Sequence, residues 1–266
     1  MALYQTHKTK RSFEKMKKMM ALLLVLVMVM SFAACAPSES TNTENTNKPT
    51  ESQTPTESQK PADGVKVMTY AEYAAAAVDS DVVIEAYVQA HQDWWSDKVT
   101  VYAQDKDGGY FIYEMACPEA DAAKLVAGTK IRVTGKKAEW SGEVEIVEAT
   151  FEIVEGDTYV AKAEDLTSLL GTDDMIKHQN MLAAFKGLTL EKVEYRNGEP
   201  GDDIYVTVGI NGASYSFCVE RYLTGPNTDV YKAFETLKVG DKVDIEGFVY
   251  WYEGINTHIT AISLAK

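Results

Sequence analysis

Basic residues, cysteines and long apolar runs are all scarce in this sequence of 266 residues, and each shortage excludes a class of protein. Lys and Arg total 26 against 40 Asp and Glu, which gives a net charge of −14. Because so acidic a chain repels phosphate backbones, nucleic acid is not the partner that the composition favours. Three cysteines are too few for a fold built on disulfides. The apolar run at residues 19–30 is shorter than the roughly 20 residues that a membrane-spanning helix needs.

Recognisable catalytic motifs are missing as well. The sequence contains no nucleophile elbow, phosphate-binding loop or kinase signature. His91, His178 and His258 are scattered, and no two of them have the spacing of metal ligands. Cys117 and Cys218 are expected to be free, buried thiols, and a disulfide between them is the alternative. We therefore expect a protein that is not an enzyme and that holds neither a metal nor a cofactor.

The N-terminal segment is typical of a secretory signal. Lysines precede the apolar run at residues 19–30, and Phe32-Ala33-Ala34-Cys35 follows it. This tetrapeptide resembles the lipobox of bacterial lipoproteins, and the resemblance implies cleavage after residue 34 and a lipid, palmitate included, on Cys35. It also implies a place on the outer face of the cytoplasmic membrane, in a Gram-positive envelope rather than a periplasm. An uncleaved anchor and an ordinary secreted protein are the alternatives.

Residues 35–63 are expected to form a disordered linker. Of the 28 residues from 36 to 63, 23 are Ser, Thr, Asn, Gln, Pro or Glu, and none is aromatic or a large aliphatic. Such a segment cannot bury enough apolar surface to offset the entropy of ordering. Its expected role is a tether between the membrane and the folded part.

An internal repeat organises the remaining chain. Leu125, Gly128, Gly135 and Gly142 recur 112 residues later at Leu237, Gly240, Gly247 and Gly254. A constant offset held over this stretch indicates a duplication. We therefore expect two similar domains, at 64–158 and 181–266, joined by a helical connector at 159–180.

Each copy has the same predicted order of strand, hairpin, helix and hairpin. The turns Asp107-Gly108 and Asn211-Gly212 favour tight hairpins, and a hairpin explains residues 105–108 better than a calcium loop. The order resembles the OB-fold, a five-stranded, partly open barrel, so the predicted fold class is all-β with short helices. Another small β-barrel or a mixed α+β sheet is the alternative. The expected strands are 82–92, 99–103, 110–115, 130–136 and 143–153, then 188–195, 204–208, 214–219, 242–250 and 256–264.

Short helices complete the prediction. Within the copies they are expected at 118–126 and 229–237. Another is expected to begin at the capping-box pattern Thr69-Tyr70-Ala71-Glu72, and two more are expected in the connector, at 164–170 and 173–178.

Aromatic residues gather at the loops that flank the ligand groove of an OB-fold. The candidate ligand-binding residues are Trp94, Trp95, Trp140, Tyr250, Trp251 and Tyr252. Rigid aromatic faces stack on sugars, bases or peptide side chains with little loss of entropy. The alternative is that one residue of each pair closes a barrel end or the interface between the copies, since neighbouring strand residues point to opposite faces.

Three functions follow, in order of preference. The first is a lipid-anchored, non-catalytic binding or adapter protein for an extracellular glycan, peptide or envelope protein. The second is binding of single-stranded nucleic acid, for which the first copy offers one basic cluster, Lys130, Arg132, Lys136 and Lys137. The third is a carboxylate-dependent hydrolase, which only the abundance of acidic residues supports.

Overall fold

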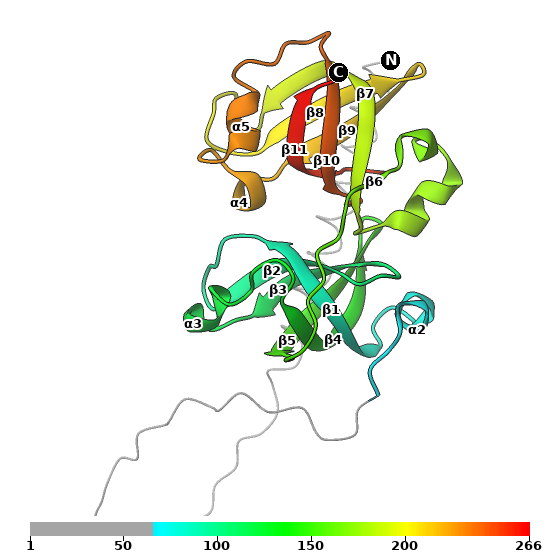
Figure 1. Cartoon of the computed structure of the whole chain (residues 1–266), viewed down its shortest axis with the longest axis vertical. Coiled ribbons are helices and arrows are strands. Elements are labelled where there is room, and N and C mark those ends of the chain that lie inside the picture. The colour runs from blue at the N-terminus through cyan, green and yellow to red at the C-terminus, as the bar shows by residue number, and fades with distance from the viewer. Residues whose placement is uncertain (1–65) are drawn as a thin grey trace, which may run out of the picture. The chain divides into compact units, whose positions relative to one another are not determined.

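Strands β1 to β5 form the first of two barrels. The computed structural model describes residues 66–266, all within one compact unit, so Cys35 and the expected linker lie outside the described residues. The strands are β1 (Asp81–His91), β2 (Lys98–Gln104), β3 (Gly109–Ala116), β4 (Lys130–Trp140) and β5 (Glu143–Ile153). They close in the order β1-β2-β3-β5-β4, with β3 and β5 parallel and every other pair antiparallel (Figure 1).

Strands β7 to β11 repeat this arrangement. They are β7 (Leu182–Tyr195), β8 (Ile204–Ile210), β9 (Ala213–Val219), β10 (Lys242–Phe248) and β11 (His258–Leu264). Their order is β7-β8-β9-β11-β10, and β10 pairs back to β7 to close the ring, again with one parallel pair, β9 and β11. A short strand, β6 (Glu164–Asp165), adds to the outer side of β7. Both rings have the OB-fold topology.

The repeated glycines explain why both copies fold alike. Gly128 and Gly240 have φ angles of +90° and +99°, a region that L side chains rarely adopt. Their backbone N–H groups donate to equivalent carbonyls of the first strands, those of Val88 (2.8 Å) and Leu190 (2.7 Å). The predicted duplication therefore corresponds to the same turn built twice.

Each barrel has its own apolar core. Alternation along the strands places one face inward, as in β4, where Ile131 and Val133 are fully buried while Arg132 between them is partly exposed. Ile84 and Ile146 join them in the first core, and an equivalent core fills the second barrel. Because both cores are closed, each copy can bury most of its aliphatic side chains without the other.

The helices are shorter than the sequence indicates. They are α2 (Tyr70–Ala75), α3 (Glu119–Ala122), α4 (Arg221–Thr224), α5 (Asp229–Ala233) and two 3₁₀ helices, Thr167–Leu169 and Asp173–His178. The expected helix at 164–170 is wrong, because residues 164–165 pair with β7 and only a single 3₁₀ turn follows. Strand β7 also begins six residues earlier than predicted, at Leu182, because Gly187 (φ +63°) lies within the strand without ending it. In the described part of the chain, no helix is both long and apolar enough to cross a bilayer.

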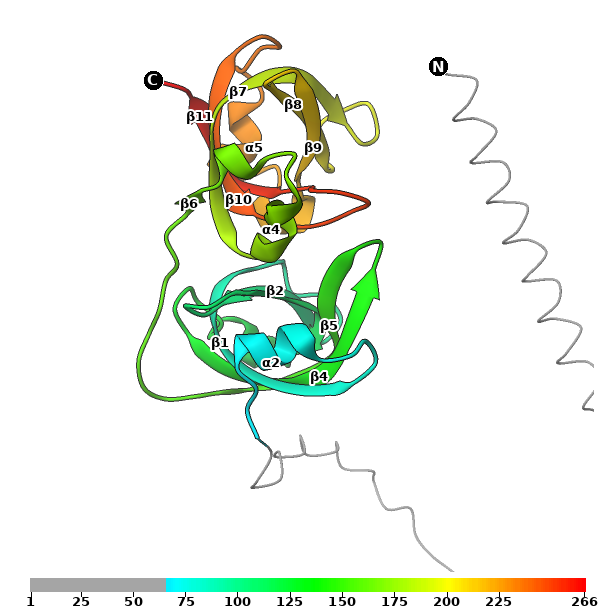
Figure 2. The same cartoon turned by 90° about the vertical axis from the view of Figure 1, so that its right-hand side faces the viewer.

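Helix α2 is fastened to the first barrel by one buried lysine. The predicted capping box at Thr69 and Glu72 begins the helix. At its other end Lys137 of β4 is only 6% exposed and donates from Nζ to the carbonyls of Tyr73 (3.0 Å), Ala74 (2.8 Å) and Ala76 (2.9 Å). The Tyr73 carbonyl also accepts the N–H of Ala76 (3.1 Å), and the ammonium group adds a second donor there and caps the C-terminal carbonyls of the helix. Figure 2 shows α2 lying against the first barrel.

We expect Lys137→Met to lower the free energy of unfolding by about 2–4 kcal/mol, because three charge-assisted hydrogen bonds are lost at a buried site. Hydrogen exchange should accelerate in the α2 amides in particular. Lys136→Met is the matched control, since Lys136 is exposed and its nearest carboxylate, Glu148, lies 3.7 Å away. Equal stability of the two variants would contradict this role of Lys137.

The two barrels are joined by a third apolar cluster and by a set of hydrogen bonds, which we call the joint. Tyr102 and Phe111 of the first barrel pack with Phe248 of the second, and all three are at most 3% exposed. The Tyr102 ring stacks on Phe248 at 4.6 Å between centroids. Nearby, the fully buried Glu143 of β5 accepts a hydrogen bond at Oε2 from the backbone N–H of Trp251 (2.7 Å).

Candidate ligand-binding cavity

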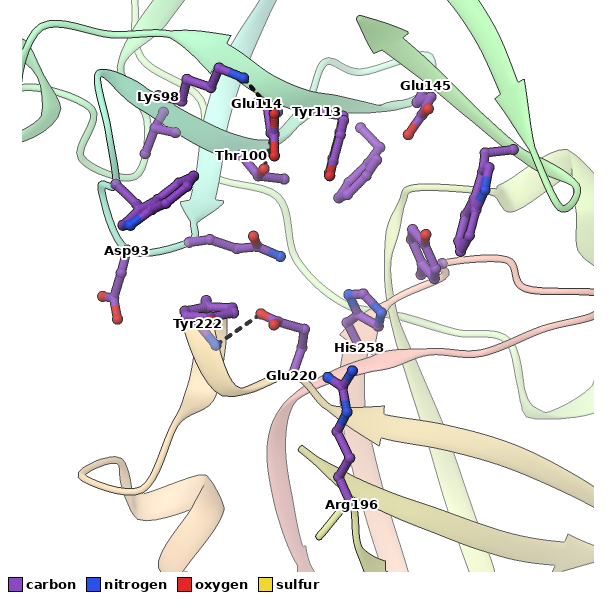
Figure 3. A pocket seen from close by; sticks show the side chains of 16 residues that line it. Asp93, Lys98, Thr100, Tyr113, Glu114, Glu145, Arg196, Glu220, Tyr222 and His258 are labelled. Atoms are coloured by element: carbon purple, nitrogen blue, oxygen red, sulfur yellow. Dashed lines mark hydrogen bonds and ion pairs between the residues drawn. The ribbon is translucent and has the colours of Figure 1, made fainter. Parts of the chain in front are cut away.

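A cavity of about 690 Å³ lies beside the joint and takes its walls from both barrels. The first barrel contributes the β1–β2 loop, β2, β3 and the β4–β5 hairpin, and the second contributes the ends of β7 and β11 and the segments that follow β9 and β10 (Figure 3). The lining residues are Gln92, Asp93, Trp95, Lys98, Val99, Thr100, Phe111, Tyr113, Glu114, Trp140, Glu145, Arg196, Glu220, Tyr222, Tyr250 and His258.

Three of the six candidate aromatic residues line this cavity. They are Trp95, Trp140 and Tyr250, and they come from three different loops or hairpins of the two barrels. Tyr252 lies next to them, with its ring 5.2 Å from that of Trp140. The loops singled out from the sequence thus meet around one hollow.

Trp94 and Trp251 lie elsewhere and fill structural positions. Trp94 packs against the core of the first barrel and donates from Nε1 to the carbonyl of Cys117 (2.8 Å). Trp251 packs against the core of the second barrel and also covers Gly142 of the β4–β5 hairpin. In each pair of neighbours one aromatic residue is therefore packed inward, as the alternation of strand residues predicts.

Exposed aromatic side chains are concentrated at the cavity. Six large aromatic side chains among residues 66–266 are substantially exposed, and four of them line it. The four are Trp95 (71% exposed), Trp140 (53%), Tyr222 (50%) and Tyr113 (44%). Tyr113 and Tyr222 were not among the sequence candidates. The sequence could have indicated that Tyr113 is exposed, because it follows the buried Ile112 on β3 and neighbouring strand residues point to opposite faces. Nothing in the sequence places Tyr222 near the first barrel.

The cavity is acidic, and its two basic side chains are already paired. Lys98 forms an ion pair with Glu114 (2.6 Å), and Arg196 forms one with Asp203, which lies outside the lining (3.0 Å). Against these two bases the walls present four carboxylates, Asp93, Glu114, Glu145 and Glu220. A negative potential is therefore expected inside the cavity.

The wall contributed by the second barrel holds two titratable groups whose pKa values are shifted toward their neutral forms. Burial lowers the pKa of His258 to about 3, so its imidazole is uncharged at neutral pH. Its Nδ1 lies 2.6 Å from the hydroxyl of Tyr102, which itself accepts a hydrogen bond from Gln92 (3.4 Å). Burial also raises the pKa of Glu220 to about 7, although the backbone N–H groups of Tyr222 and Leu223 donate to it.

Three of the four residues in the basic cluster of the first copy form internal contacts. Arg132 is held between Glu85 (2.7 Å) and Glu152 (2.5 Å), and Lys130 also contacts Glu85 (3.1 Å). Lys137 is the buried lysine that closes helix α2. These three side chains are therefore not available to phosphate groups, and of the cluster only Lys136 is exposed, 3.7 Å from Glu148.

The remaining polar motifs are structural. Asp105 accepts hydrogen bonds at Oδ1 from the N–H groups of Asp107 (2.7 Å) and Gly108 (2.8 Å), which is the expected hairpin turn. No group of three or more His, Cys, Asp and Glu side chains in residues 66–266 is placed to hold a metal ion. Cys117 and Cys218 are free and buried, as expected.

The fold and the cavity define the chain as a tandem OB-fold protein with an aromatic-lined hollow. No family model and no curated protein sequence matches it. It is similar to three solved structures in particular. A murine DNA-binding protein bound to double-stranded DNA has a TM-score of 0.34 and 10% identity over 69% of this chain and 95% of the other. The Ifi202 HINa domain in complex with double-stranded DNA has a TM-score of 0.33 and 14% sequence identity, over 70% of this chain and 100% of the other. A replication protein A heterotrimer bound to single-stranded DNA has a TM-score of 0.29 and 13% sequence identity, over 70% of this chain and 49% of the other. The ligands of these proteins do not transfer to this chain at such TM-scores.

Proposed function

We propose that this protein is a non-catalytic binding protein that takes its ligand in the cavity between its two OB barrels. The observation that carries the proposal is the gathering of four exposed aromatic side chains around one hollow of about 690 Å³. Exposed aromatic faces cost free energy in water and recover it when a sugar ring or a peptide side chain stacks on them. The volume lies within the usual range for ligand pockets.

The membrane attachment is a second part of the proposal. The lipobox resemblance at Phe32–Cys35 supports a lipid-anchored protein on the outer face of a bacterial cytoplasmic membrane, with the barrels carried on a tether. Mass spectrometry of the mature chain tests this part directly. An N-terminal Cys35 carrying diacylglycerol and palmitate is expected, and a mature chain with an unmodified Cys35 would contradict it.

Binding of single-stranded nucleic acid is the alternative function. The aromatic rings favour it, because bases stack on such rings in OB-folds. The charges oppose it, since a cavity with four carboxylates and two paired bases repels a phosphate backbone. A gel shift with oligonucleotides that weakens as salt is raised would favour this alternative over the first function.

We expect Trp140→Ala to weaken ligand binding about 5- to 30-fold, because stacking on one exposed ring contributes on the order of 1–2 kcal/mol. Residues 66–266, which contain both cores, would be screened against arrays of glycans and short peptides, and the affinity of each hit measured by titration calorimetry. Tyr205→Ala is the matched control, because Tyr205 is exposed (39%) but lies outside the cavity. Hits that bind wild type and Trp140→Ala equally would place the ligand elsewhere and refute the proposal.

A further inference from the structure

One carboxylate of the cavity wall is buried and has no ion-pair or hydrogen-bond partner among residues 66–266. Glu145 of β5 is only 9% exposed and lines the cavity. Within residues 66–266 its carboxylate forms no ion pair and accepts no hydrogen bond, and burial alone raises its pKa. Its oxygens are not among the fully buried, unpartnered polar atoms, so they reach the cavity, where no described side chain pairs with them.

Two tyrosines, Tyr113 and Tyr250, line the cavity together with this carboxylate. Burial raises the pKa of both Tyr113 and Tyr250, and the negative charge of Glu145 contributes to the rise in each. Both tyrosines line the cavity, and Figure 3 shows Tyr113 and Glu145 on the same side of it. A carboxylate next to aromatic rings is the arrangement that binds an organic cation, since the carboxylate supplies the charge and the rings supply cation–π contacts.

No basic side chain of the cavity supplies the missing charge. Lys98 is engaged by Glu114, and Arg196 is engaged by Asp203. Asp93 of the β1–β2 loop is a second, exposed carboxylate of the cavity and forms no ion pair with any described residue. The positive charge that would complete the site must therefore come with the ligand.

We propose that the ligand presents an ammonium or guanidinium group on an alkyl chain, as in a lysine or arginine side chain of a peptide, and that this group binds Glu145 between Tyr113 and Tyr250. The inference rests on the proposed function and specifies its ligand. A neutral glycan would leave Glu145 without a charged partner, and a nucleic acid would bring further negative charge to it. A free polyamine offers the same chemistry as the peptide side chain.

The test compares cationic probes with neutral probes of the same shape. Residues 66–266 would be titrated with acetyl-Gly-Arg-Gly-amide, with the same peptide carrying citrulline in place of arginine, and with spermidine. We expect the arginine peptide to bind at least tenfold more tightly than the citrulline peptide. Binding of spermidine but not of the peptide would support the cation site and assign it to free polyamines. Equal binding of the arginine and citrulline peptides, or binding of none of the three, would overturn the inference.

A variant locates the cation. Glu145→Gln should weaken binding of the cationic probe at least tenfold, whereas Glu155→Gln, the same change at an exposed position outside the cavity, should leave it unchanged. Circular dichroism checks that both variants fold. If a glycan or a peptide binds in a way that Trp140→Ala weakens but Glu145→Gln does not, the proposed function stands and the cation inference fails. If the cationic probe binds and neither variant affects it, both fail.

Discussion

Raising the pH from 6.5 to 8 is expected to lower the free energy of unfolding by about 2 kcal/mol, and Glu143→Gln is expected to remove most of that decrease. Glu143 is fully buried, and burial raises its pKa from the usual 4.5 to about 8. The folded protein therefore binds a proton that the unfolded chain has released at these pH values. The resulting stability is complete below pH 4.5 and is lost as the pH rises through 8.

Two other buried groups determine the pH window for this measurement. Glu220, like Glu143, stabilises the folded protein less as the pH rises. Its contribution to the free energy of unfolding is mostly lost by about pH 7, because its pKa is about 7. His258 has the opposite effect on stability. Its pKa in the folded protein is about 3, so the protein becomes less stable as the pH falls below 6.5. Between pH 7 and 8 the slope therefore belongs mainly to Glu143.

Urea unfolding followed at several pH values between 6.5 and 8 measures this slope. Glu155→Gln serves as the exposed control and should keep the wild-type slope. A Glu143→Gln variant whose stability falls with pH as steeply as that of the wild type would show that Glu143 is ionised in the folded protein. Because Glu143 accepts the N–H of Trp251, the same titration reports on the joint between the barrels.

The barrels were largely predictable because their determinants are local. Turn residues such as Asn211 and Gly212, both with positive φ, mark the hairpins, and the alternation of apolar residues marks the strands between them. The glycine offset of 112 residues predicted that the two copies share one topology, which the strand order confirms. The error at residues 164–170 arose because pairing with β7 overrode a helical pattern.

The cavity was only partly predictable because it depends on contacts between the copies. Trp95 and Trp140 could be identified by their loops, whereas Tyr222 and Glu220 reach the site only because the joint brings the second barrel to the first. The choice between Trp94 and Trp95 also needed the structure, since the core contacts and the hydrogen bond of Trp94 to Cys117, and the exposure of Trp95, show which of the two is packed. Glu145 gives no signal in a sequence with 40 acidic residues.

Tyr102→Ala is expected to lower the free energy of unfolding by about 3–5 kcal/mol and to abolish ligand binding in the cavity. The side chain is 1% exposed, and its ring lies against Phe248 (4.6 Å) and Phe111 (5.2 Å), so its removal leaves a void in the joint. Phe248 leads directly into Tyr250, and the hydroxyl of Tyr102 holds the cavity-lining His258. The same truncation therefore releases one wall of the cavity.

Tyr102→Phe separates the two contributions of this residue. It keeps the stacked ring but leaves Nδ1 of the buried His258 without the hydroxyl at 2.6 Å, so a smaller loss of about 1–3 kcal/mol is expected, with binding retained. Urea unfolding followed by tryptophan fluorescence gives both values, and small-angle scattering reports whether the barrels separate. If Tyr102→Ala costs no more than Tyr102→Phe, the stacked ring does not hold the joint. Because cavity residues come from both barrels, loss of binding together with barrel separation in Tyr102→Ala would tie ligand recognition to the joint rather than to either copy alone.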